Sequence, residues 1–509
     1  MRRRAPLFRP VPPVVIACSL VPLALAACAV GPRYTSPEIP VPETWRESSP
    51  AEAPAPGSSL ERWWTGFHDP TLDSLIARAV KDNLDLKIAS ARIREARAAR
   101  GIAAAAAMPQ VDAEGAYSRT ERSDAVPPFK LAPDASSPFG AREQSVFEAG
   151  FDAGWEIDVF GGVRRDKEAA LAQVQAAEEG RRDVLVTLLA DIARNYAELR
   201  GTQRQLEILE ETLRSERDTL DITKARFEAG LGAELDVERA DGLLSATTAE
   251  RPSLERLAKQ AVYRLGVLIG QDPGAVASEL ERPGIIPVAP PEVPQTLPSE
   301  LLSRRPDLRR TERELASATA RVGVAKADLF PRFSINGSLG RRSEDAGDLG
   351  SGSSRFWILG PRVHWPILSG GRIRANIRVQ DARQEQALRQ YEKAVLTALE
   401  EVENALASHA REQSRQESLR GSVQANRRAL DLAMERYTSG LENFISVLDA
   451  QRSVYAAEDQ LVQSEKNGVV TLIAVYKALG GGWSLDEDRP APPNSGAQAQ
   501  VGVAQTKGP

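Results

Sequence analysis

The residue with the clearest chemistry is Cys28. It ends the stretch Leu25-Ala26-Ala27-Cys28, which resembles a bacterial lipobox, where cleavage precedes the cysteine and diacylglycerol is attached to its thiol. Cys18 lies in the segment that this cleavage removes. The mature chain would keep one cysteine, and therefore no internal disulfide and no thiolate metal site. We predict a covalent lipid on Cys28 and no other cofactor.

The segment before Cys28 has the features of an export signal. Four arginines precede an apolar stretch over 11–27 that ends in small residues, which is typical of a secretory signal. After residue 27, no apolar run approaches the roughly 18 residues of a spanning helix. Removing residues 1–27 takes away four arginines and changes the net charge from −5 to −9. An acidic chain argues against a nucleic-acid partner. Ala29, which stands where some lipoproteins carry Asp, favours sorting to the outer membrane.

A second polar group stands near the end of the chain, where Ile445, Asp449 and Arg452 follow one another at spacings of four and three. On a helix, these spacings place Asp449 beside both other residues. From the residues alone, this is an ordinary surface ion pair that contributes at most about 1 kcal/mol.

The remaining candidates for chemistry do not form a site. His68, His364 and His409 are far apart in the sequence and have no HExxH motif or cysteine cluster beside them. His409 is expected to be packed or to face a lumen rather than to bind a metal. The sequence has no GxxxxGK[ST] loop for a nucleotide. We therefore predict no metal site, no catalytic residue and no enzyme activity.

The elements that carry these residues occur twice. The stretch "ARFEAGL" at 225–231 matches "ERYTSGL" at 435–441, at an offset of 210 residues. Pro109 and Pro331 match at an offset of 222. A period above 200 residues is too long for a solenoid and indicates a duplicated half.

Each half contains two segments with the period-two pattern of a strand. Residues 147–158 alternate between apolar and mostly acidic or glycine positions, which gives one apolar face and one wet face. This pattern fits strands that cross a bilayer, and it also fits a soluble sheet with one buried face. The lipid anchor favours a barrel. The predicted strands lie at about 109–121, 145–158, 331–342 and 355–367.

Very long helices follow the strands. No proline occurs over 163–229 or 372–439, and a helix of that size is about 100 Å long. Apolar residues recur every seven positions, which favours helices wound about one another. Gly230 and Gly440 then interrupt the pattern, and second helices are expected over 233–269 and 443–479. The first heptad series is Leu185, Ile192, Leu199, Leu206, Leu213, Leu220 and Phe227; the second is Val395, Val402, His409, Gln416, Val423, Leu430 and Tyr437.

Four strands cannot close a barrel, and an open sheet edge is not tolerated in lipid. Several copies must therefore share one barrel. The sequence pattern allows two chains with eight strands or three chains with twelve.

The chain resembles the TolC family of outer-membrane efflux proteins, in its OprM/NodT-like lipoprotein branch. The resemblance covers nearly the whole mature chain. The stretches that carry it are "CAVGPRYTSPEIPVPETW" after the signal, "WWTGFHDPTLDSLI" (63–76), "WEIDVFGGVRRDKEAA" (155–170), "ARFEAGL", "VLDAQRSVYAAEDQL" (447–461) and "VYKALGGGW" (475–483).

The resemblance implies a fold that is mainly α with a transmembrane β-barrel. Three copies would form a homotrimeric 12-stranded barrel in the Gram-negative outer membrane, continuous with a long periplasmic α-helical barrel. The implied function is the passive exit duct of a tripartite efflux pump, which expels small molecules such as drugs. Its implied partners are a periplasmic adaptor protein, an inner-membrane transporter of the resistance-nodulation-division (RND) class, and outer-membrane lipid.

The resemblance also implies roles for particular residues. Ile445, Asp449, Arg452 and Tyr437 match the region that closes the periplasmic end, where threefold symmetry would gather the Asp449 carboxylates. Ser446 stands where some relatives carry a second acid, so that ring would be less acidic here. The hairpin tips, Gly230 with Leu231 and Gly440 with Leu441, would receive the adaptor. We expect the second hairpin to swing open when the adaptor docks.

The predicted organisation has five parts, and two other functions stay open. One alternative is a lipid-anchored periplasmic coiled-coil scaffold or adaptor, and another is a duct for type I secretion. The parts are a lipoprotein signal peptide (1–27), a lipid anchor with a Pro-rich strap (28–62), a first repeat with its helical hairpin over 163–269 (63–280), a second repeat with its hairpin over 372–479 (281–483), and a disordered tail (484–509).

Overall fold

The computed structural model describes residues 29–47, 60–121, 123, 143–288, 290 and 297–484. The predicted signal peptide, Cys28 and the tail beyond residue 484 lie outside the described residues. The chain forms two compact units. The first comprises Met1–Ile39, Ser90–Glu179 and Arg310–Ala394, and the second comprises Pro40–Ala89, Gly180–Arg309 and Val395–Pro509.

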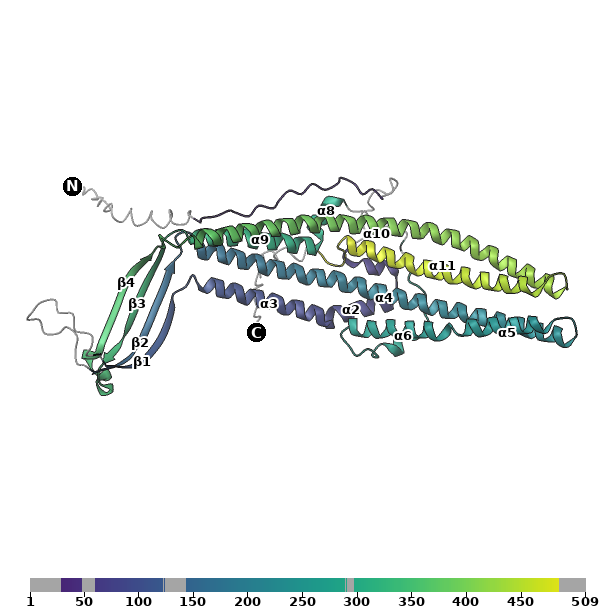
Figure 1. Cartoon of the computed structure of the whole chain (residues 1–509), viewed down its shortest axis with the longest axis horizontal. Helices are drawn as coiled ribbons and strands as arrows, with labels where there is room; N and C mark the ends of the chain where they lie inside the picture. The colour runs from purple at the N-terminus through teal and green to yellow at the C-terminus, as the bar shows by residue number, and fades with distance from the viewer. Residues whose placement is uncertain are drawn as a thin grey trace, which may run out of the picture. The chain divides into compact units, whose positions relative to one another are not determined.

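The first unit contains one antiparallel sheet in the order β1-β2-β3-β4, so that β1 and β4 are its edges (Figure 1). The register pairs Tyr117 with Phe147 and Leu339 with Trp357. Large apolar side chains on these strands are exposed in the single chain, with Trp357 70% accessible. The strands are β1 (Gln110–Glu121), β2 (Glu143–Ile157), β3 (Arg332–Ser343) and β4 (Arg355–His364).

The last strand is shorter than the sequence pattern indicated. It was predicted to reach residue 367, but β4 ends at His364. Pro366 has no N–H to donate to a sheet ladder, so it limits the strand from this side.

Two helices of 67 residues each continue from the sheet, α4 (Gly162–Glu228) and α10 (Arg372–Thr438). Glycines with positive φ precede both, Gly161 at 81° and Gly371 at 83°. Most of the predicted heptad positions are buried within the second unit, for example Leu199 and Leu213 at 0% exposure. The heptad pattern therefore identified the packed face of these helices.

The second helix of the first hairpin corrects the prediction. It was expected to run unbroken over 233–269, but it is interrupted at Ala249 and Glu250. Pro252 stands at the start of the next helix, where its ring excludes the helical hydrogen bond to residue 248. The two pieces are α5 (Glu234–Thr248) and α6 (Arg251–Leu268), whereas α11 (Phe444–Ala478) is continuous in the second hairpin.

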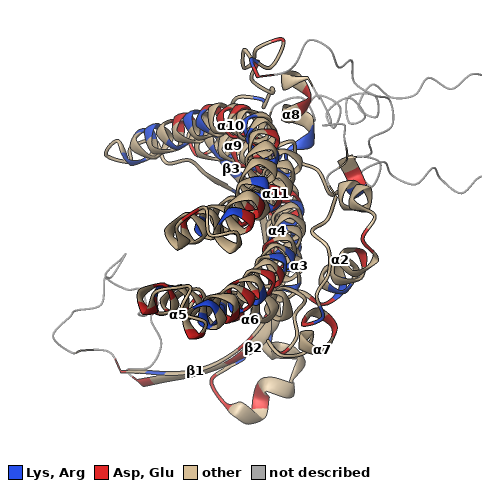
Figure 2. Ribbon diagram, turned by 90° about the vertical axis from the view of Figure 1, so that its right-hand side faces the viewer, with Lys and Arg blue, Asp and Glu red and all other residues tan. Residues whose placement is uncertain are grey.

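Shorter elements complete the two units. They are η1 (Leu60–Phe67), α2 (Pro70–Asp82), α3 (Leu84–Ala105), α7 (Ala277–Leu280), α8 (Pro298–Arg304), α9 (Pro306–Ala327), η2 (Ala346–Gly350) and η3 (Gly352–Ser354). None of the helices in the described part of the chain combines the length and apolarity that a membrane span requires. Figure 2 shows basic and acidic residues interspersed along α4 and α10.

The largest core lies in the second unit and includes tryptophans of the strap and of η1. Trp45 and Trp63 are 6% and 4% exposed, and Trp64 packs against the same cluster. The Trp63 ring stacks on Tyr476 of α11 with centroids 5.0 Å apart. Burying large aromatic side chains contributes strongly to packing, so these tryptophans fix the strap and η1 to the helices.

Candidate functional site

Both hairpins turn with the same backbone geometry at their tips. The N–H of Leu231 donates to the carbonyl of Arg226 at 2.7 Å, and Leu441 donates to Arg436 at 2.8 Å. The glycine before each leucine has positive φ, 72° at Gly230 and 75° at Gly440. This is a glycine-terminated helix end, which a residue with a Cβ forms at a cost. The leucines themselves are 68% and 69% exposed.

Near the tips, the two hairpins pack against each other within the second unit. Arg226 of α4 donates to the carbonyl of Thr438 at 2.9 Å, and its guanidinium lies 4.8 Å from the centroid of the Tyr437 ring. A small apolar cluster joins the hairpins behind this contact. Its buried members are Leu220, Ala240 and Leu243 from the first hairpin and Tyr437, Phe444, Val447 and Leu448 from the second.

The four predicted gate residues are divided between this cluster and the surface. Tyr437 is 4% exposed and packs on Phe444, and its hydroxyl has no partner among the described residues. Ile445, Asp449 and Arg452 are exposed in the single chain. The ion pair that the spacing of Asp449 and Arg452 suggested is not formed, although both residues are described.

Arg452 instead acts on an acid of the other hairpin. Glu216 of α4 is 3% exposed, and one of its carboxylate oxygens accepts a hydrogen bond from Thr247 of α5 at 3.0 Å. Its other oxygen has no partner among the described residues. Burial raises the pKa of the Glu216 carboxyl above its ordinary value; the charge of Glu250 acts in the same direction, while Thr247 and Arg452 oppose it.

A direct hydrogen bond joins the hairpins at the break between α5 and α6. The Tyr455 hydroxyl on α11 donates to a Glu250 carboxylate oxygen at 2.5 Å. Arg251, the next residue, forms an ion pair with Glu210 of α4. Ala249 and Glu250 keep helical backbone angles but lie between the two helices, so the acid that receives Tyr455 stands at their junction.

Two further polar contacts tie α11 to α4. The Gln451 side chain donates to the Thr219 hydroxyl at 2.8 Å, and this contact is buried. Gln205 donates to an Asp459 oxygen at 2.6 Å. Together with Tyr455, these contacts form a row along α11, which we call the inter-hairpin clasp: Thr219–Gln451, Glu250–Tyr455 and Gln205–Asp459.

The sequence reasoning missed the clasp for an identifiable reason. Glu250 and Tyr455 are 205 residues apart, and no local spacing relates them. Pro252 was the available signal, because a proline inside a predicted helix marks a probable boundary.

The histidines do not gather into a site. His409 is 5% exposed, with the Thr471 hydroxyl 3.2 Å and the Gln413 side chain 3.1 Å from its ring nitrogens. Burial lowers the pKa of His409 below its ordinary value. It is thus a packed residue, one of the two roles expected for it. The described residues contain no group of His, Cys, Asp and Glu suited to a metal ion.

The similarity of this chain to known proteins identifies its family. The outer membrane efflux protein family matches residues 75–271 and 297–481. The pyoverdine export outer membrane protein OpmQ of Pseudomonas aeruginosa is 34% identical over 466 residues, covering 91% of this chain and 96% of that protein. The outer membrane protein OprJ of the same organism is 33% identical over 477 residues, covering 93% and 96%.

The solved structure of the outer-membrane channel OprN is 36% identical and superposes with a TM-score of 0.81, covering 90% of this chain and all of that chain. This likeness sets aside the alternative of a periplasmic scaffold. The chain therefore belongs to the outer membrane efflux protein family and is an outer-membrane channel of the TolC type.

Proposed function

We propose that the chain works as the passive exit duct of a tripartite efflux pump, as a homotrimer that shares one 12-stranded barrel. The observation that supports this proposal most is the four-stranded sheet, whose edges β1 and β4 pair with no other strand among the described residues. In a bilayer, unpaired backbone groups must find partners. Pairing β4 of one copy with β1 of the next meets this requirement, and three copies supply twelve strands.

A covalent lipid on Cys28 is part of the same proposal. Its support is the sequence before the strap, Leu25-Ala26-Ala27-Cys28. Each buried methylene of an acyl chain contributes about 0.8 kcal/mol to membrane binding. An acylated amino terminus and a shared barrel would hold the same chain in the same membrane.

The proposed partners are a periplasmic adaptor protein and an inner-membrane RND transporter, which would supply the energy. The exposed leucines of the tips, Leu231 and Leu441, support adaptor docking there, because exposed apolar side chains favour a protein contact. The proposed cargo is small organic molecules. One relative carries pyoverdine export in its name, which describes that protein.

The proposed gate combines Tyr437, Ile445, Asp449 and Arg452 with the inter-hairpin clasp. In the closed state, the clasp holds α11 of the second hairpin against α4 and the break of the first. Adaptor docking at the tips would separate the hairpins, and water would then replace the side-chain hydrogen bonds. Threefold symmetry would bring three Asp449 carboxylates together, where their repulsion must be offset by a cation, water or Arg452.

Conductance of the purified protein in planar bilayers tests this function. We expect a heat-sensitive trimer in SDS and a small, mostly closed conductance. Asp449→Ala combined with Arg452→Ala should raise the open fraction. The matched control is Arg428→Ala with Asp431→Ala, which removes two exposed charges at the same spacing on α10. A monomer without conductance would contradict the duct, whereas a double variant as tightly closed as the wild type would contradict only the gate.

A further inference from the structure

The first described residues of the strap lie against the junction between β2 and α4, within the first unit. The N–H of Val30 donates to the carbonyl of Phe160 at 3.1 Å. Phe160 follows the end of β2 by three residues and stacks on Phe330 with centroids 4.6 Å apart. The strap therefore begins at the helix-proximal end of the sheet, directly after the predicted acylation site.

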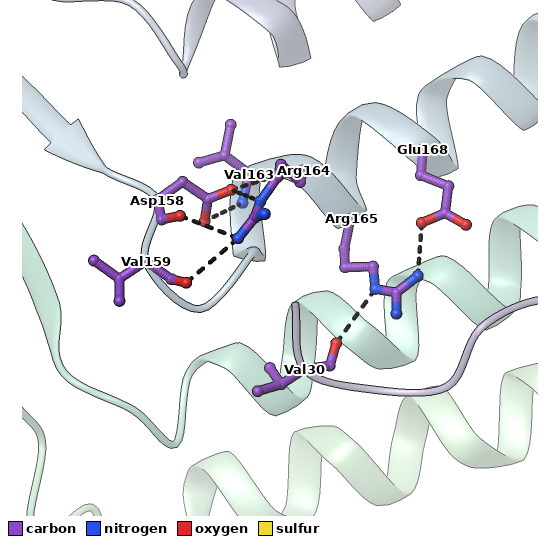
Figure 3. Close-up of polar contacts among 7 residues, drawn as sticks. All are labelled: Val30, Asp158, Val159, Val163, Arg164, Arg165 and Glu168. Carbon is purple, nitrogen blue, oxygen red and sulfur yellow. Dashed lines mark hydrogen bonds and ion pairs between the residues drawn. The ribbon is translucent and has the colours of Figure 1, made fainter. Parts of the chain in front are cut away.

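A buried arginine holds this beginning in place (Figure 3). The Arg165 side chain is 5% exposed and pairs with Glu168 at 2.7 Å. Its guanidinium also donates to the carbonyls of Val30 and Gly31, each at 3.3 Å. A buried guanidinium group is costly to leave unpaired. Two of its acceptors belong to the strap, so the strap completes the site.

Glycines allow the strap to reach backbone distance. A Cβ added at Gly161, where φ is 81°, would lie 2.8 Å from the Cα of Ala29. A Cβ added at Gly31, where φ is 95°, would lie 2.5 Å from the Cα of Gly323 on α9. Side chains at these positions would collide with main chain, so the close approach depends on glycine.

The duplicated junction shows that this arrangement is not required to start a long helix. At the offset of 210 residues, Gly371 matches Gly161 as the positive-φ glycine before the helix, and Ala375 stands in place of Arg165. The residue before Ala375, in the first turn of α10, is Arg374. Arg374 is exposed, and a Cβ added at Gly371 meets nothing within 4 Å. Among the described residues, the strap therefore contacts the first junction through features that the second junction lacks.

Two tryptophans lie at the same end of the sheet. The indole N–H of Trp155 donates to the carbonyl of Ala107 at 3.0 Å, and Trp365 donates to Leu329 at 3.1 Å. The two residues remain 39% and 54% exposed. Partly exposed tryptophans with satisfied N–H groups are typical of the membrane–water interface.

We propose that Ala29–Gly31 and Arg165 form an anchor seat, which fixes the lipid of Cys28, and with it the leaflet surface, at the β2–α4 junction. The proposal rests on the lipidation proposed above. Cys28 lies outside the described residues but is joined to Ala29. The chain directly after the predicted acylation site is thereby held at Phe160, at the same end of the sheet as the two tryptophans. Through the anchor seat, attachment of the lipid to the membrane would stabilise the folded trimer.

A cycle between acylation and the seat tests this proposal. The acylated protein is compared with a Cys28→Ser form exported behind a general secretory signal, and the temperature at which the SDS-resistant trimer dissociates is measured in outer-membrane vesicles. We expect acylation to raise this temperature in the wild type and to lose that effect in Arg165→Ala. The control is Arg374→Ala, which removes an exposed arginine from the first turn of α10, and in it the effect of acylation should persist.

A second variant leaves the fold untouched. Six Gly and Ser residues inserted between Cys28 and Ala29 keep every described contact but free the lipid from the seat, so acylation should again give no rise. An equal rise in wild type, Arg165→Ala and the insertion variant, or no rise in wild type, would overturn the seat. Labelling with radioactive palmitate separates the two proposals, because an unlabelled wild type would also overturn the lipidation itself.

Discussion

The two hairpins arise from duplicated sequence, yet their seams are built differently. In the first hairpin, Leu199 and Leu206 of α4 share an apolar groove with Ala258 and Val262 of α6. At the position that matches Leu199, the second hairpin carries His409, which contacts Thr471 of α11 and Gln413 of its own helix. At this matched position, the first seam buries hydrocarbon and the second is held by hydrogen bonds.

The hydrogen bonds of the second seam continue along the hairpin. Gln416, which matches Leu206, donates to the carbonyl of Ser464 at 2.9 Å. The Ser464 hydroxyl in turn donates to Glu412. Separating an apolar seam exposes hydrocarbon at about 25 cal/mol per Å², whereas water replaces much of a lost hydrogen bond. The second hairpin is therefore the one that we expect to move.

The largest expected effect would break this comparison directly. Leu199→Ala removes a fully buried side chain, and we expect it to lower the free energy of unfolding by about 2–5 kcal/mol. His409→Ala, at the duplicated position, removes side-chain hydrogen bonds and should cost only about 1–3 kcal/mol. Denaturant titration of the trimer, followed by helical circular dichroism, measures both. Equal losses would mean that the two seams are energetically alike.

The next prediction concerns the contact between the hairpins. Tyr455→Phe removes the hydrogen bond to Glu250 and should destabilise the closed state by about 1.5 kcal/mol per subunit. That corresponds to about a tenfold change in an equilibrium constant, read as a higher open fraction in single-channel recordings.

Tyr263→Phe is the matched control, because Tyr263 lies on α6 and is 47% exposed. It should leave the recordings unchanged. If Tyr455→Phe does the same, the clasp has no part in closure.

Sequence patterns predicted the hairpins well and their mutual contacts poorly. The seven-residue repeat predicted Leu199 as a packed position and His409 as packed or facing a lumen, because burial of a helix face leaves a periodic pattern in the sequence. Contacts such as Thr219 with Gln451 leave no such trace, since they depend on how two distant helices are paired. The same holds for Arg165 and the strap carbonyls.

At Asp449, by contrast, the sequence suggested a contact that the structure does not form. Helical spacing predicted Asp449 and Arg452 as neighbours on one helix face, but an exposed ion pair gains little from Coulomb attraction in water. The side chain of Arg452 instead influences Glu216, which lies 236 positions earlier in the chain. Spacing indicates which residues share a helix face, while burial decides which charges interact.

A smaller expected effect is the pH dependence of stability that the buried acid of the first hairpin, Glu216, contributes. The pKa of Glu216 is raised in the folded protein above its ordinary 4.5. The folded state then binds this proton more tightly than the unfolded state, so the contribution is full at low pH and is lost as pH rises past 4.5. We expect Glu216→Gln to be more stable than wild type at pH 8, with the difference shrinking toward pH 4. A difference that does not change with pH would contradict this assignment.

The smallest effect belongs to the second hairpin and has the opposite sign. Burial lowers the pKa of His409 below its ordinary 6.5, so the unfolded state binds this proton more readily. Stability from neutral His409 is present above pH 6.5 and is lost as pH falls. Facing groups are Thr471 and the backbone of Gly468 on α11 and Gln413 on α10.

We expect His409→Gln, which keeps hydrogen bonding without a titrating group, to unfold with a weaker dependence on pH between 5 and 7 than wild type. His364→Gln, at an exposed position of β4, is the control and should keep the wild-type slope. Unchanged slopes in both variants would show that the polar seam does not sense protons. The second hairpin would then differ from the first only in how easily water replaces its contacts, which the comparison of Leu199 with His409 already measures.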